Sequence, residues 1–225
     1  MNKLFNAIFI TAFVFSACSK TPIVELPITT TSPKALKHYS KAMLYQEVNE
    51  GFESKRDLDL ALALDSNFAM AIESYPTQDP LVRRKNREKV DSLIDKLSMS
   101  EQLRIKINRS YRDKNMDKAL KHAKKLVELH GDSYDSYLWL GQVQSDRNEI
   151  DDAIGSLKIA IELNPNRYEA YDKLIGHQIP MGDRAMLPQE RRDTELGSKY
   201  ADELIRIRPD AGFPYHWKAN IFRQL

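Results

Sequence analysis

Several common features are scarce in this 225-residue sequence, and each scarcity excludes a class of protein. A single cysteine excludes an intramolecular disulfide and a cysteine-based zinc site. Only 8 glycines and 10 prolines are present, and strand-like runs bounded by turn residues are missing, which argues against sandwiches and barrels. The 34 basic residues nearly balance 32 acidic ones, so the total charge does not indicate a nucleic-acid-binding protein.

Catalytic motifs are missing as well. The sequence contains no Gly-rich phosphate-binding loop, no dinucleotide fingerprint, no H-E-x-x-H and no G-x-S-x-G. None of the five histidines has another histidine four residues away on a predicted helix. We therefore predict a protein that is not an enzyme, with no catalytic residues, no metal site and no cofactor.

The N-terminus has the parts of a secretory signal peptide. A cationic start at Lys3 precedes a mostly apolar run of twelve residues from Leu4 to Phe15. Twelve helical residues span about 18 Å, which is shorter than a hydrocarbon core of about 30 Å, so a stable transmembrane helix is not expected. We predict that residues 1–17 are a signal peptide.

The residues around the single cysteine point to a lipid anchor. Phe15-Ser16-Ala17-Cys18 resembles the lipobox of bacterial lipoproteins, with phenylalanine where leucine is usual. The resemblance implies cleavage before Cys18 and attachment of acyl chains such as palmitate, and two or three chains would make the anchoring effectively permanent. The alternatives are a soluble secreted protein with a chance cysteine, or an uncleaved apolar tail.

The segment that follows is rich in serine, threonine and proline, so we predict that residues 18–33 carry the lipid and form a flexible tether. Ser19 stands where lipoproteins retained in the inner membrane of enteric bacteria have aspartate. The resemblance therefore favours the periplasmic side of the outer membrane, within the bacterial cell envelope.

From residue 34 onward, apolar residues recur at helical spacing and the sequence repeats itself. Four pairs of like residues are separated by 34 positions: Ala119 and Ala153, Leu129 and Leu163, Tyr137 and Tyr171, Leu140 and Leu174. Small residues at fixed places allow two antiparallel helices to approach closely, and larger ones fill the space to the next pair.

The clearest unit, residues 134–167, resembles the tetratricopeptide repeat (TPR), a 34-residue helix pair. The matching residues are Tyr137, Leu140, Gly141, Ala153, Leu157, Ala160 and Pro165. Gln144 departs from the tyrosine of that pattern. The resemblance implies an all-α solenoid of antiparallel TPR-like helix pairs, wound as a right-handed superhelix.

We assign the helical repeat domain to residues 34–225, with the best-matching repeats at 100–133, 134–167 and 168–211. About ten extra residues in the last of these are placed at 182–192, between its two helices. A looser unit at 35–67 and an irregular helix pair at 68–75 and 80–97 precede them. The final segment, 213–225, resembles the first helix of a further pair. Either this helix docks alone as a cap, or the chain is a fragment of a longer protein, which we favour.

In TPR folds the first helix of each pair lines a concave groove that binds partner proteins or peptides. Carried over by alignment, the resemblance implies a partner-binding groove at Arg104, Asn108, Tyr111, Arg112, Leu138, Gln142, Ser145 and Asp172. Arg104 and Asn108 resemble the start of a clamp for C-terminal carboxylates, but Trp139 stands where that clamp needs asparagine, so we do not predict that ligand.

The sequence thus predicts a membrane-anchored, non-catalytic TPR scaffold or adaptor that binds a partner protein or peptide, with no nucleic acid. Two alternatives stay open: the N-terminal part of a longer solute- or glycan-binding lipoprotein, or a regulatory TPR segment of a longer signalling protein. Residues 83–125 form a basic band, with fifteen Lys and Arg against six acidic residues. This band suits anionic lipid or an acidic partner, or is simply a set of solvated helix faces.

Overall fold

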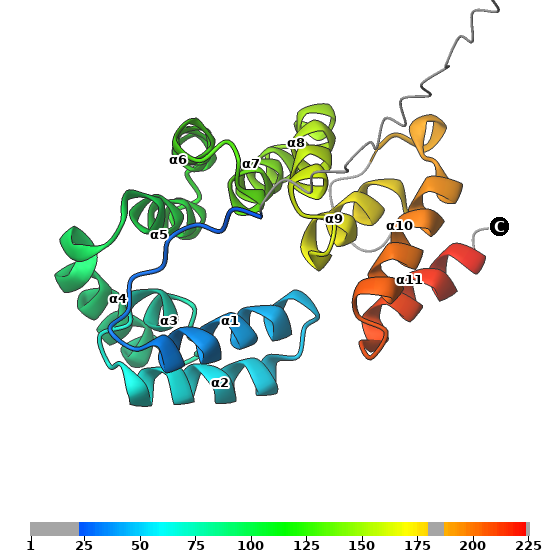
Figure 1. Ribbon diagram of the computed structural model, residues 1–225. Helices are drawn as coiled ribbons and strands as arrows, with labels where there is room; N and C mark the ends of the chain where they lie inside the picture. The colour runs from blue at the N-terminus through cyan, green and yellow to red at the C-terminus, as the bar shows by residue number, and fades with distance from the viewer. Residues whose placement is uncertain (1–22, 180–186, 224–225) are drawn as a thin grey trace, which may run out of the picture.

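A computed structural model describes residues 23–179 and 187–223 of the chain. The predicted signal peptide and Cys18 lie outside these residues. Eleven α-helices run through the described part, with one 3₁₀ turn after α4 (Ile94–Lys96) and one before α10 (Gln189–Arg191) (Figure 1). The helices are α1 Pro33–Glu47, α2 Gly51–Leu64, α3 Ala69–Glu73, α4 Pro80–Leu93, α5 Met99–Arg112, α6 Met116–Leu129, α7 Tyr134–Asp146, α8 Ile150–Leu163, α9 Tyr168–Gln178, α10 Thr194–Ile207 and α11 Gly212–Phe222.

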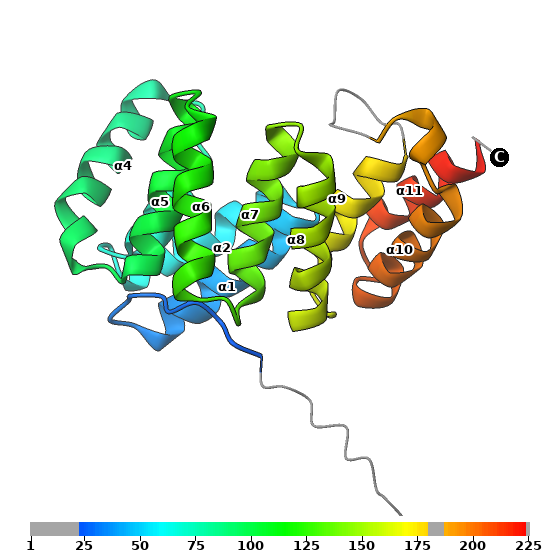
Figure 2. The same ribbon diagram turned by 90° about the horizontal axis from the view of Figure 1, so that it is seen from above.

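Consecutive helices pair as antiparallel hairpins: α1 with α2, α5 with α6, α7 with α8, and α9 with α10. The last three hairpins stand side by side in chain order, because α6 packs against α7 and α8 packs against α9 (Figures 1 and 2). The predicted fold class, an all-α solenoid of antiparallel TPR-like helix pairs, is confirmed. The predicted repeats 100–133 and 134–167 each contain one such hairpin.

The turns inside three hairpins have the same backbone structure. Asn49, Lys114 and Asn148 each adopt positive φ, between 53° and 62°, one residue before the final turn position. The next N–H in each turn donates to the carbonyl five residues earlier, at 2.8–2.9 Å. A left-handed residue followed by this bond is the Schellman ending of a helix, which satisfies carbonyls left free at the terminus. The repeat is therefore visible in the backbone as well as in the side chains.

Small residues allow the helices of one hairpin to approach closely. A Cβ atom added to Gly141 on α7 would lie 2.8 Å from Cγ of Leu157 on α8. Ala153 and Ala160 on α8 are fully buried. Helix α5 begins as predicted, because Ser98 and Glu101 form the predicted capping box at its start.

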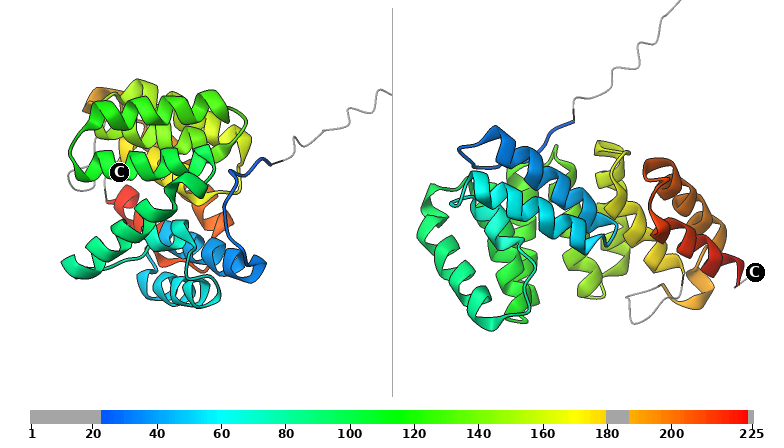
Figure 3. Two further views of the ribbon diagram at one scale, coloured as in Figure 1. Left: turned by 90° about the vertical axis from the view of Figure 1, so that its left-hand side faces the viewer. Right: turned by 90° about the horizontal axis from the view of Figure 1, so that it is seen from below.

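The N-terminal hairpin does not simply extend the stack. The irregular pair, α3 and α4, follows this hairpin and precedes α5. Its path places α1 and α2 across the inner side of the later hairpins (Figure 1 and Figure 3, right). At one end, Tyr39 and Phe68 share a buried cluster with Ile105 of α5. At the other, Val48 shares a cluster with Tyr168 and Ile175 of α9. The hairpin therefore spans the inner face of the solenoid from α5 to α9.

Residues 23–32 are extended and packed, so the predicted flexible tether does not reach residue 33. Leu26 is 4% exposed and shares a buried cluster with α5, α6 and α7. Buried Glu101 accepts hydrogen bonds from the backbone N–H and hydroxyl of Thr29 at 2.7 and 2.6 Å. Asp65 accepts from the hydroxyl of Thr30 at 2.7 Å and the N–H of Thr31 at 2.9 Å. The composition of this segment predicted a solvated chain. Its threonines are instead held by hydrogen bonds to the buried carboxylates of Glu101 and Asp65.

The predicted extra residues, 182–192, fall in the connection between α9 and α10, and 182–186 lie outside the described residues. Residues 179–193 connect α9 to α10, whereas three residues connect the helices of each of the other hairpins. After α10, helix α11 packs against it through Trp217, whose side chain is fully buried. Phe222 near its end is 73% exposed.

A candidate binding cavity on the inner face

The first helices of the hairpins enclose a cavity of about 670 Å³. Helix α1 bounds it on one side, and α5, α7 and α9 bound it on the other, with Glu25, Leu26 and Ile28 at its edge. No residue of α6, α8 or α10 lines it. Its lining mixes apolar, amide and charged side chains, including Tyr39, Met43, Leu44, Glu47, Arg104, Asn108, Asp135, Leu138, Trp139, Gln142, Arg167, Glu169, Asp172 and Lys173.

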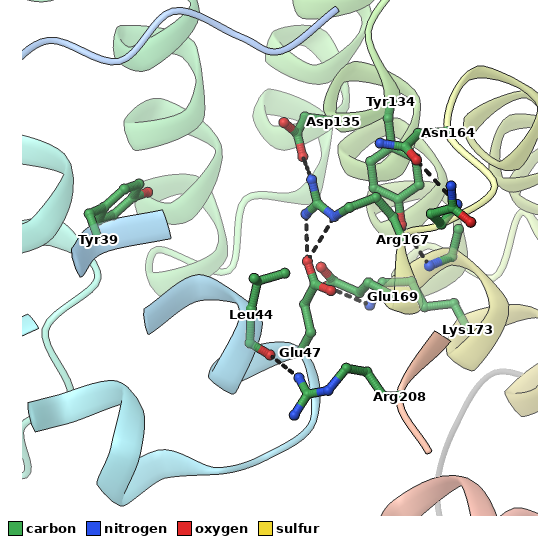
Figure 4. Close-up of polar contacts among 12 residues, drawn as sticks. Tyr39, Leu44, Glu47, Tyr134, Asp135, Asn164, Arg167, Glu169, Lys173 and Arg208 are labelled. Atoms are coloured by element: carbon green, nitrogen blue, oxygen red, sulfur yellow. Dashed lines mark hydrogen bonds and ion pairs between the residues drawn. The ribbon is translucent and has the colours of Figure 1, made fainter. Parts of the chain in front are cut away.

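An ion pair between Glu47 and Arg167 holds α1 against the far wall of this cavity (Figure 4). The Nε and Nη2 atoms of Arg167 lie 3.0 and 2.5 Å from the same Glu47 oxygen. The Glu47 side chain is 7% exposed and that of Arg167 is 24% exposed. Burial raises the pKa of Glu47 above its ordinary value, although the charge of Arg167 opposes that rise.

Arg167 also makes contacts within its own wall. Its Nη1 lies 3.6 Å from a carboxylate oxygen of Asp135, and its guanidinium carbon lies 4.8 Å from the centre of the Tyr134 ring. Burial would lower the pKa of Arg167, but the attraction of Glu47 and Asp135 raises it overall. Arg167 is therefore a fixed cation that links α1 to α7 and to the start of α9.

A second arginine contacts the end of α1. Arg208, in the connection between α10 and α11, donates from Nη1 to the carbonyl of Leu44 at 3.5 Å (Figure 4). Its Nη2 lies 3.8 Å from a carboxylate oxygen of Glu50. Two arginines from the C-terminal half thus converge on the C-terminal end of α1 and the turn that follows it.

Arg104 of α5 lies at the opposite part of the cavity. Its Nη2 donates to the hydroxyl of Tyr39 at 3.4 Å, which is a long hydrogen bond. Its Nε is buried and has no hydrogen-bond partner among the described residues. Burial alone would lower the pKa of Arg104, whereas the fields of Tyr39 and Asp135 raise it. The side chain therefore keeps its charge at the edge of the cavity.

Of the eight predicted groove residues, the five that line the cavity are Arg104, Asn108, Leu138, Gln142 and Asp172. Asp172 accepts a hydrogen bond from the Trp217 indole at 2.7 Å, and Gln142 donates to Asp146 at 2.5 Å.

The three predicted residues outside the cavity have other partners. The Tyr111 hydroxyl donates to Asp146 at 2.7 Å, and Arg112 pairs with Glu73 of α3 at 2.6 Å. Ser145 is buried against His177 of α9 at 3.0 Å. The alignment with TPR folds placed them on the inner face, but none of the three lines the cavity.

Sequence reasoning missed the side of the cavity that α1 supplies. Tyr39, Met43 and Glu47 come from a hairpin that the repeat pattern placed at one end of a linear stack. Glu47 and Arg167 are 120 residues apart, and no local pattern links them. The one available signal was the irregular segment between the first hairpin and α5, which breaks the 34-residue register.

Neither a metal-binding cluster nor a membrane-spanning helix occurs in residues 23–179 and 187–223. No group of three or more His, Cys, Asp or Glu side chains there is placed to hold a metal ion. None of the helices described is at once long enough and apolar enough to cross a bilayer.

Comparison with known proteins yields likeness only among solved structures. No family model matches this chain, and no curated protein matches it. One similar structure is YrrB, described as a TPR protein with an unusual peptide-binding site, at 19% identity and a TM-score of 0.46, covering 82% of this chain and 92% of that one. Another is the TPR domain of P58(IPK), at 16% identity and a TM-score of 0.41, covering 82% of this chain and 54% of that one. These likenesses concern the fold alone.

Proposed function

We propose that this chain is a non-catalytic scaffold or adaptor that binds a segment of a partner protein in the cavity between α1 and the inner helices. The cavity itself carries the proposal. Its volume of about 670 Å³ lies within the roughly 300–1,000 Å³ of ordinary ligand pockets. It is large enough for a short stretch of peptide, and polar groups from several helices converge on it.

The cavity walls are held in place before any partner arrives. Arg167 is fixed by Glu47, Asp135 and the Tyr134 ring, and Asp172 is fixed by Trp217. A partner that binds such walls loses little additional side-chain entropy, which favours association.

The lining also indicates the kind of segment that fits. Five carboxylates and three cations face the cavity: Glu25, Glu47, Asp135, Glu169 and Asp172 against Arg104, Arg167 and Lys173. Leu138 and Trp139 supply apolar surface between them. An extended segment with a lysine or arginine next to an apolar side chain suits this mixture.

The location in our proposal is the bacterial cell envelope, with the chain held by acyl chains on Cys18. The support is the sequence: a cationic start, a short apolar run and small residues before the cysteine. The serine at position 19 favours the outer membrane, on its periplasmic side.

Site-specific photo-crosslinking in membranes of the native host tests the binding proposal. A photoreactive residue replaces Asn108, which lines the cavity, and in a separate variant it replaces Lys158, which is exposed on the outer helix α8. We expect a discrete adduct with a partner protein from position 108 and none from position 158. Equal adducts from both positions, or saturable binding of a glycan in place of a protein, would refute the proposal.

A further inference from the structure

A second surface on the outer side of α6 carries lysines without acidic partners. Lys118, Lys121 and Lys124 are exposed on this helix, and half-buried Lys106 of α5 lies beside it. Among the described residues no carboxylate pairs with these four lysines. The nearby acids are engaged elsewhere, since Asp117 pairs with Arg147 at 2.5 Å and Glu128 pairs with Lys125 at 2.8 Å.

The field of these lysines acts on a histidine between them. His122 is half-buried on α6, next to a shallow surface depression that Leu120 also lines. Burial lowers the pKa of His122, and the charges of Lys106, Lys121 and Lys118 lower it further. Lys106, Lys118 and Lys121 therefore lie close enough to His122 to act on it together.

The described chain begins beside the end of this helix. Val24 forms a β-bridge with Ser133, in the turn between α6 and α7, and Leu26 shares a buried cluster with Ala123 and Leu126 of α6. Cys18 precedes Ile23 by five residues, which reach at most about 18 Å when fully extended. A lipid on Cys18 therefore keeps Ile23 within about 18 Å of the bilayer, beside the turn that ends α6, and α6 itself is about 21 Å long.

We propose that the outer face of α6, with Lys118, Lys121, Lys124 and Lys106, docks on anionic phospholipid headgroups of the bilayer that holds the anchor. This inference rests on the proposed lipidation of Cys18, which places the surface close to that bilayer. A lysine near an anionic membrane surface increases binding about fivefold, so the set favours a docked over a freely rotating orientation. Docking through α6 leaves the cavity, on the inner face, turned away from the headgroups.

Amine footprinting of the full lipidated chain in vesicles tests this orientation. The protein is reconstituted into vesicles that contain phosphatidylglycerol or into vesicles of phosphatidylcholine alone, and an amine-reactive reagent labels accessible lysines. In the first vesicles we expect labelling of Lys118, Lys121, Lys124 and Lys106 to fall several-fold relative to the second. Labelling of Lys34, Lys37 and Lys199, which lie on α1 and α10, stays the same. High salt should remove the protection, because it screens exposed charges.

Matched variants assign the effect to the surface. Replacing Lys118, Lys121 and Lys124 together by glutamine should abolish the protection of Lys106. The control triple, K34Q/K37Q/K199Q, removes the same charge and should leave that protection intact.

The outcomes separate this inference from the proposed anchor. If the protein does not float with either vesicle, lipidation fails and the docking fails with it. If it floats and all seven lysines label equally in both vesicles, only the docking is overturned. Protection by inorganic phosphate alone, or only by an acidic protein added to phosphatidylcholine vesicles, would also overturn membrane docking.

Discussion

Glu47, at the end of α1, and Arg167, at the start of α9, are joined by two N–H to oxygen contacts at 3.0 and 2.5 Å across 120 residues of sequence. The pair closes the first hairpin onto α9, and this hairpin lies across the inner side of the later ones (Figure 3). The cavity exists because of this closure, since α1 supplies one of its walls.

Removing the guanidinium of Arg167 should weaken the contact between α1 and α9. Replacing Arg167 by glutamine leaves the buried Glu47 carboxylate without its partner, and breaking a buried pair from one side costs about 3 kcal/mol. We expect a lower free energy of unfolding in urea and faster amide exchange in α1. As a control, Arg84→Gln removes an exposed pair with Glu88 and should cost under about 0.5 kcal/mol. Equal losses in the two variants would mean that the closure adds no stability.

Two glycines should respond to alanine with opposite signs. In Gly141→Ala the new Cβ meets Leu157 at 2.8–3.0 Å and the Ala153 carbonyl at 3.3 Å, so overpacking should cost about 1–3 kcal/mol. In Gly155→Ala, within α8, nothing lies within 4 Å, and the gain in helix propensity should add about 0.5–1 kcal/mol. Thermal melts of the two variants measure both changes. A stabilised Gly141→Ala variant would contradict the close packing of α7 on α8.

The extended segment before α1 should be structural. Leu26→Ala removes a buried side chain from the cluster of α5, α6 and α7, which should cost about 2 kcal/mol. Ile23→Ala, three residues earlier, changes a side chain that is 53% exposed and should cost much less. Unfolding in urea distinguishes the two. A Leu26→Ala variant as stable as Ile23→Ala would restore the prediction of a free tether.

Acid should release the same segment through Asp65. Burial opposes ionisation of this carboxyl, but hydrogen bonds from Thr30, Thr31 and Asn67 lower its pKa below the ordinary value of 3.8. A group whose folded-state pKa is lowered stabilises the fold above its unfolded-state pKa, and this stabilisation is lost as the pH falls through the folded-state value. We expect wild-type stability to fall below about pH 4 more steeply than that of Asp65→Asn.

Hydrogen exchange of residues 29–32 and unfolding in urea, each measured from neutral to acidic pH, report this difference. Thr30→Val, which removes one donor, should give an intermediate slope. Identical slopes for the wild type and Asp65→Asn would show that the carboxylate is not linked to folding.

The sequence predicted the parts of the fold that depend on residues close together in the chain. The spacing of Ala119 and Ala153 and of Leu140 and Leu174 gave the hairpins α5–α6 and α7–α8 nearly to the residue, because helix faces and close approach are encoded every few positions. Gly141 identified one close approach correctly.

The closure of the cavity could not be predicted in the same way. Periodicity shows which side of α5 or α7 faces inward, but it does not show what meets that side. Tyr39 meets Arg104 across 65 residues, and Thr29 meets Glu101 across 72. Such contacts are decided by the path of the irregular helices α3 and α4, which no repeat specifies.

The central claim is that a partner segment occupies the cavity between α1 and the inner helices. The most direct measurement is a calorimetric titration into the purified chain of a free peptide with the sequence of the partner segment that crosslinks at position 108. We predict saturable one-to-one binding that weakens at least about tenfold in Asn108→Arg, which fills the cavity, and is unchanged in Lys158→Glu on the outer face. Equal affinity for both variants, each folded by its thermal melt, would contradict the claim.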